Sequence, residues 1–100
     1  MANLVITYWR DIPSAVSVKL GRQEEKRMLD NRFMEAIDMA AMRDGATATD
    51  DYLAHWRRGE PIAVSDDLAA EADKAKTRLE NEYSQDRINK LIGTGGRETK

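Results

Sequence analysis

Residues that commonly catalyse reactions or bind metals are few in this sequence. His55 is the only histidine, and cysteine is absent. Zinc and iron sites need several imidazole or thiolate ligands, and a lone imidazole cannot supply such a set. Because the chain has no cysteine, disulfides, thiolate catalysis and iron–sulfur ligation are excluded. We therefore expect no metal and no cofactor, and an ordinary helix position for His55.

Acidic pairs and serines are the remaining catalytic candidates. The acidic pairs are Glu24-Glu25, Asp50-Asp51 and Asp66-Asp67. Adjacent side chains on a helix point about 100° apart, so these carboxylates do not converge on one substrate or ion. None of the serines has a spacing from His55 that specifies a Ser/His/Asp triad. The sequence therefore assigns no catalytic residue, and an enzyme is the less favoured class.

Methionines offer a different chemistry, the binding of another protein. Met34, Met39 and Met42 share one expected helix with Phe33 and Ile37. Flexible thioether side chains adapt to the shape of a partner. The apolar residues of this segment occupy more of the helix circumference than one sheet face covers. Either another helix packs on them or an apolar strip stays exposed for a partner; filling of the core is the simpler alternative.

Composition and charge narrow the class of protein. The chain has 100 residues, 16 basic and 18 acidic side chains, and a formal net charge of -2. This balance gives no long-range attraction to nucleic acid or anionic lipid. No apolar run approaches the roughly 18 residues of a membrane span, and the N-terminus lacks the basic region of a signal peptide. We expect a cytoplasmic protein that binds neither nucleic acid nor membrane.

Strands are expected at the N-terminus. Residues 4–9 are β-branched and aromatic, and residues 15–20 alternate between apolar and polar. Because Pro13 falls between these runs, they are expected to form an antiparallel hairpin with a loop of about five residues. The charged segment 24–29 favours a third strand, since charges often protect sheet edges.

Three helices are expected after the strands. Residues 32–44 carry the apolar stripe and end at Gly45. Residues 50–58 begin with acids and end with two arginines, as the helix dipole prefers. Ser65 is expected to cap a long third helix, and a break in it at residues 84–86 is left open. Its narrow apolar seam could also support a homo-oligomer.

Strands followed by helices are typical of the α+β class. The sequence predicts a small antiparallel sheet of two or three strands, built on the N-terminal hairpin and covered by three helices. Residues 62–64 could add a further extended stretch. Residues 1–92 are expected to form a single α+β domain, and the glycine-rich residues 93–100 a flexible C-terminal tail.

Four segments together resemble a known bacterial family. They are Leu4 to Pro13, Val18-Lys19 with Gly21-Arg22, Arg32 to Met42, and Trp56 to Pro61. The set is similar to the small bacterial virulence factor domain, which is similar to a module of conserved virulence factor C. The family carries no agreed catalytic motif. Its stand-alone members tend to be encoded beside folate-linked and corrinoid-linked methyl-transfer enzymes, so the resemblance implies an accessory protein of one-carbon metabolism.

The resemblance draws attention to two segments that combine aromatics, arginines and a proline. If the first expected strand and the second expected helix end side by side, they form a patch of Trp9, Arg10, Trp56, Arg57 and Arg58. Such a patch recognises an anionic or planar group by paired hydrogen bonds and stacking. The alternative is local surface pairing of Arg10 with Asp11 and of Arg58 with Glu60.

Two functions follow from these residues. The first is a non-enzymatic accessory or protein-binding module that docks on a larger protein, such as a methyl-transfer or folate enzyme. Its docking face would be the helix of Met34, Met39 and Met42 or the aromatic and arginine patch. The alternative is a small ligand-binding or catalytic protein that acts on an anionic metabolite through the patch. A closed pocket behind the arginines favours the second, and an exposed apolar strip favours the first.

Overall fold

A sheet of five antiparallel strands and four helices make up the part of the chain that the computed structural model describes, residues 1–45 and 49–97. The strands are β1 (Ala2–Trp9), β2 (Ile12–Leu20), β3 (Gln23–Met28), β4 (Trp56–Arg58) and β5 (Ile62–Val64). The helices are α1 (Asn31–Arg43), α2 (Thr49–Ala54), α3 (Leu68–Glu82) and α4 (Gln85–Gly93). The expected α+β class is confirmed, but the strands and helices outnumber the two or three strands and three helices expected.

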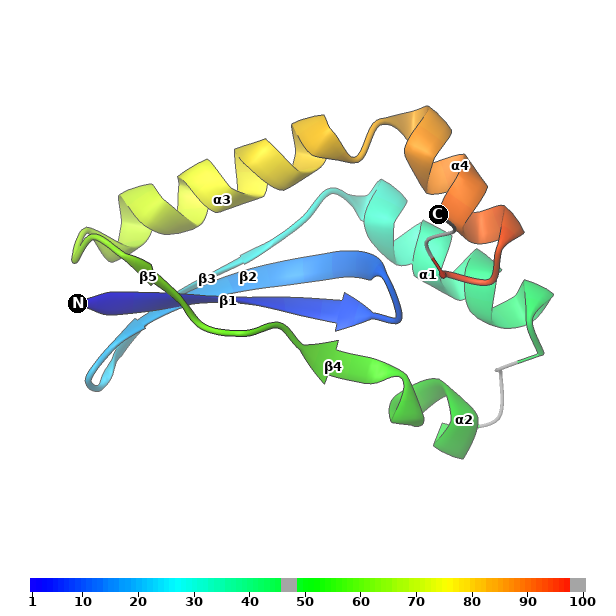
Figure 1. Cartoon of the computed structure of the whole chain (residues 1–100), viewed down its shortest axis with the longest axis horizontal. Helices are drawn as coiled ribbons and strands as arrows, with labels where there is room; N and C mark the ends of the chain where they lie inside the picture. Colours follow the sequence, from blue (N-terminus) through cyan, green and yellow to red (C-terminus); the bar gives the residue numbers. More distant parts are fainter. Residues whose placement is uncertain (46–48, 98–100) are drawn as a thin grey trace.

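The sheet has the strand order β3-β2-β1-β4, and β5 also pairs with β1. In Figure 1, α3 runs along one side of the sheet, while α1 and α4 lie beyond the end where β1 finishes. α2 lies next to β4 at that same end. The strand expected over 24–29 is confirmed as β3, and the extended stretch over 62–64 as β5. The end of β1 is therefore where most of the elements meet.

The hairpin of β1 and β2 is tighter than expected. Trp9 pairs with Ile12, so the turn consists of Arg10 and Asp11 alone and the expected loop of about five residues is wrong. Arg10 closes the turn with a left-handed φ of 54°. β2 then includes Pro13, next to an irregularity in its register with β1. Such an irregularity tolerates a residue that has no N–H to donate.

The prediction of a helix over residues 50–58 is also wrong for residues 55–58. α2 ends at Ala54, and Trp56–Arg58 form β4 against Thr7–Trp9 of β1. The edge of β1 offers backbone hydrogen-bond partners to this segment. These long-range bonds override the weak local preference of arginines for the end of a helix.

The remaining helices follow their sequence signals closely. α1 matches the helix expected over 32–44, and Gly45 follows it with a left-handed φ of 72°. α3 is capped by Asp67, whose carboxylate accepts the N–H of Ala70, and not by Ser65 as expected. The break at residues 84–86 is real, because the Ser84 side chain caps a separate helix, α4. This break supplies the fourth helix.

One apolar core joins the sheet to the helices. Its largest fully buried side chains are Trp9, Ile12, Pro13, Val16, Val18, Phe33, Ile37 and Ile88. Phe33 of α1 meets the Tyr83 ring edge to face, with 6.1 Å between ring centroids. No helix within the described residues has the length and apolar character needed to cross a membrane.

Gly95 and Gly96, which the sequence assigns to a flexible C-terminal tail, lie against the turn between β1 and β2. Gly95 and Gly96 are buried and have left-handed φ angles of 69° and 90°. The Gly96 carbonyl accepts the N–H of Asp11 at 2.8 Å. Glycine is required here because a Cβ on Gly96 would lie 3.0 Å from the Trp9 ring. Residues 98–100 of the expected tail lie outside the described residues.

Truncation of Phe33 tests this core. Phe33→Ala is expected to lower the free energy of unfolding by about 3 to 5 kcal/mol, because it leaves a cavity among buried side chains. The matched control is Met39→Ala on the exposed side of the same helix. This variant should change the free energy of unfolding by about 0.5 kcal/mol or less. Urea unfolding followed by circular dichroism measures both values. Equal losses in the two variants would contradict the assignment of the core.

Candidate functional site

The arginine and aromatic residues of the predicted patch do come together, through strand pairing. Trp9 lies opposite Trp56 in the register of β1 with β4, and Arg57 lies opposite Tyr8. Arg10 follows directly in the turn, and its backbone N–H donates to the His55 carbonyl at 3.0 Å. Strand pairing, and not the end of a helix, therefore assembles the patch.

Arg10 points into the protein, and only 6% of its side chain is exposed. Its Nη1 donates to Asp44 Oδ2 and to the Gly95 carbonyl, both at 2.6 Å. Its Nη2 lies 3.1 Å from Nε2 of His55. The guanidinium thereby joins the β1–β2 turn to the end of α1, the end of α2 and the C-terminal turn. We call this set, Arg10 with Asp44, His55 and Gly95, the arginine hub.

The hub also keeps Asp44 ionised and holds the Arg10 guanidinium against the Trp9 ring. The pKa of Asp44 lies below its ordinary value, because Arg10 donates a hydrogen bond to the carboxylate and adds a nearby positive charge. The Arg10 guanidinium stacks over the Trp9 ring, 4.7 Å from its centroid. Within the described residues, Nε of Arg10 is buried without a hydrogen-bond partner. The Arg10 cation is thus used internally, and an outside ligand would have to break these contacts to reach it.

Trp9 is the apolar half of the same arrangement. It is fully buried, and its indole N–H donates to the Tyr52 carbonyl at 2.8 Å. Its ring stacks on Tyr52 with 5.8 Å between centroids, and His55 packs edge-on at 5.7 Å. Trp56 in turn meets Tyr52 edge to face at 5.9 Å. Both tryptophans therefore hold α2 on the sheet rather than face solvent as free anchors.

Arg57 and Arg58 are the exposed members of the patch. The Arg57 guanidinium stacks over the Tyr8 ring at 4.4 Å, and its Nε donates to the Arg10 carbonyl at 2.9 Å. The same side chain pairs with Asp11 at 3.4 Å. The local pairs expected from the sequence are Arg10 with Asp11 and Arg58 with Glu60. The Arg10 guanidinium is instead directed to Asp44. The predicted patch therefore divides into a buried structural part and a short exposed arginine pair.

The three predicted methionines divide in a similar way. Met34 is half-buried and packs against the core, as the core-filling alternative expects. Met39 and Met42 are 47% and 64% exposed. Leu53 of α2 is 59% exposed. Exposed apolar side chains therefore remain on both α1 and α2.

A shallow groove of about 320 Å³ lies where α1 meets α2. Its lining residues are Asp38, Ala41, Met42 and Tyr52. Burial and then the nearby charge of Asp38 raise the pKa of the Tyr52 hydroxyl. We call the groove, together with the exposed Met39 of α1 and Leu53 of α2, the docking surface. Sequence reasoning missed the α2 residues, because Leu53 gives no local signal until α2 is known to lie beside α1.

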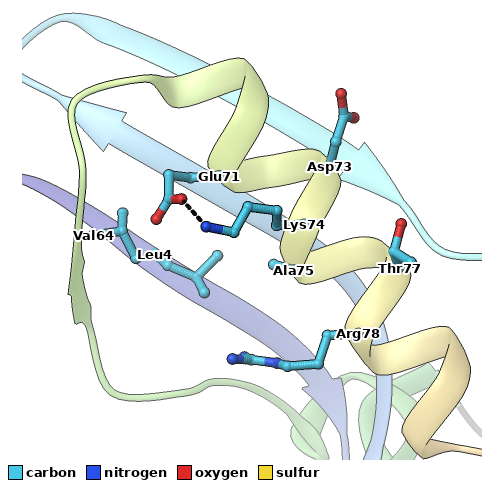
Figure 2. A pocket seen from close by; sticks show the side chains of 8 residues that line it. All are labelled: Leu4, Val64, Glu71, Asp73, Lys74, Ala75, Thr77 and Arg78. Carbon is cyan, nitrogen blue, oxygen red and sulfur yellow. Dashed lines mark ion pairs between the residues drawn. The ribbon is translucent and has the colours of Figure 1, made fainter.

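A second and larger groove of about 570 Å³ lies between α3 and the strands β1 and β5 (Figure 2). Its lining includes Leu4, Val64 and Ala75, with charged side chains around them. No residue of this groove was expected to form a site. Among the described residues there is no group of three or more His, Asp or Glu side chains that could hold a metal ion.

Comparison with known families decides the affiliation of the chain. A family model described as "Virulence factor" matches residues 7–92. The chain belongs to the virulence factor family. The matched segment of this family includes the turn between β1 and β2, all of α1 and α2, and most of α4. Searches of curated proteins and of solved structures give no significant match.

The hub gives a pH-dependent prediction. Because the folded-state pKa of Asp44 is depressed, its stabilising effect is present above its ordinary pKa of 3.8 and is lost as the pH falls through the lower folded value. Asp44→Asn should therefore lower the melting temperature at pH 7, and the gap to the unmodified protein should narrow as the pH falls below 3.8. Glu60→Gln, at an exposed position, should show little gap at either pH. A gap for Asp44→Asn that is constant with pH would refute the charged pair as its cause.

Proposed function

We propose that this member of the virulence factor family is a non-enzymatic accessory module that binds a larger protein through its docking surface. The observation that carries the proposal is the exposure of Met42 at the groove, together with that of Met39 and Leu53 on the two helices that line it. Single exposed apolar side chains are common on protein surfaces. Several of them beside a groove are typical of an interaction site.

The chemistry of the groove suggests the form of the partner. Met39 and Met42 can adjust their rotamers to a partner, and Tyr52 supplies an aromatic wall of the kind that dominates binding energy. Glu35 and Asp38 lie on the exposed side of α1 and add negative charge there. An amphipathic helix with apolar anchors and a basic residue facing Asp38 would fit this surface.

The resemblance adds a class of partner to the proposal. We propose an enzyme of folate-linked or corrinoid-linked methyl transfer in the cytoplasm, because stand-alone family members tend to be encoded beside such enzymes. The alternative, an anionic ligand bound at the predicted patch, is less favoured because Arg10 already holds Asp44 and Gly95. Arg57 and Arg58 are exposed, but Arg10, the third arginine of the predicted patch, is buried and is not accessible to such a ligand.

The test is capture of the partner followed by measurement of affinity with purified proteins. The tagged chain is used to capture its partner from a lysate of the organism that encodes it. Binding of the purified partner is then measured for the double variant Met39→Gln/Met42→Gln. The expected result is a loss in affinity of about tenfold or more, because two exposed apolar side chains of the surface become polar.

The control variant is Met28→Gln, which changes an exposed methionine on β3, away from the docking surface. It should bind the partner as the unmodified chain does. Equal binding by the double variant and the control would refute the docking surface. Sedimentation of the chain alone tests whether a second copy covers the surface instead, since self-association lost in the double variant would replace a larger partner with a homo-oligomer.

A further inference from the structure

The groove between α3 and the β1–β5 edge is a site separate from the docking surface. Figure 2 shows Leu4, Val64 and Ala75 between two sets of charged side chains, the pair Glu71–Lys74 on one side and Arg78 on the other. Its volume of about 570 Å³ falls within the roughly 300 to 1,000 Å³ of small-molecule pockets. The lining combines a mostly apolar floor with a few polar groups, as such pockets do.

Small side chains on α3 explain why this space exists. The buried seam of α3 runs through Ala72 and Ala75 between two leucines. α3 packs mainly on β2 and β3, and much less on β1. An alanine on α3 is too short to fill the space over β5, which is only three residues long. The buried Leu4 side chain and the half-buried Val64 therefore line an open groove rather than a packed interface.

The charges around the groove favour one kind of ligand. Glu71 is paired with Lys74 at 3.1 Å, and its pKa lies below the ordinary value because Lys74 donates a hydrogen bond to it. Asp73 is directed away from the floor and pairs with Arg27 at 2.9 Å. Arg78 extends over the groove and makes an exposed ion pair of 3.9 Å with Glu82. Lys74 is thus held by Glu71, whereas the ion pair of Arg78 is longer and exposed.

We propose that this groove binds a small amphiphilic carboxylate. The hydrocarbon part lies on Leu4, Val64 and Ala75, where its burial removes apolar surface from water. The carboxylate pairs with the guanidinium of Arg78, whose planar fork matches two carboxylate oxygens. The Glu71–Lys74 pair closes the other end of the groove and disfavours a second negative charge there.

Decanoate is the probe for this proposal, titrated below its micelle concentration while the amide signals of the protein are followed by NMR. The expected result is a saturable shift of the signals of Leu4, Val64 and Ala75. Butyrate lacks most of the hydrocarbon and decanol lacks the charge, so each should bind at least about tenfold more weakly. Shifts spread over the whole surface, or no saturation at the groove, would overturn the proposal.

The matched variants separate Arg78 from a general charge effect. Arg78→Gln removes the guanidinium at a half-exposed position and should weaken decanoate binding at least about tenfold. Arg22→Gln removes an exposed arginine from the turn between β2 and β3 and should leave the affinity unchanged. Equal affinities for the two variants, or equal affinities for decanoate and decanol, would show that no carboxylate site exists at Arg78.

Discussion

The buried guanidinium of Arg10 is the interaction on which the rest of the structure depends. A buried cation is costly unless it is paired and hydrogen-bonded, so its position is stable only while Asp44, His55 and the Gly95 carbonyl surround it. These partners come from three segments that lie far from Arg10 in the sequence. One side chain therefore holds together the ends of α1 and α2, the C-terminal turn and the β1–β2 turn.

The docking surface is a consequence of that arrangement. Its groove has one wall on α1 and the other at Tyr52 of α2. Asp44 follows α1 directly and His55 follows α2 directly, so the hub fixes the relative positions of the two walls. Trp9 adds a second fixation through its hydrogen bond to the Tyr52 carbonyl. The exposed methionines are thus presented by a preorganised pair of helices, which lowers the entropic cost of binding a partner.

Local sequence signals predicted the elements that depend on nearby residues. These are α1, with its apolar stripe and the Gly45 that follows it, and the charged edge strand β3. The sequence leaves the break at residues 84–86 open, and the Ser84 side chain that caps α4 there is also a local signal. Features that depend on distant partners could not be predicted in this way. β4 exists because β1 offers it an edge, and Gly95 and Gly96 are ordered because Trp9 and Arg10 pack on them. Arginine is usually exposed, so the sequence favoured an outward Arg10; its internal role appears only with its partners in place.

Amide hydrogen exchange in Arg10→Lys tests most directly whether the hub holds these segments together. A lysine ammonium is a compact donor that cannot bridge the carboxylate, the carbonyl and the imidazole at once. The account predicts faster exchange at position 10 and at Asp11, whose amides bond to His55 and Gly96, while Val5 in the middle of β1 keeps its protection. Unchanged exchange at these turn amides, or an equal increase at Val5, would contradict it.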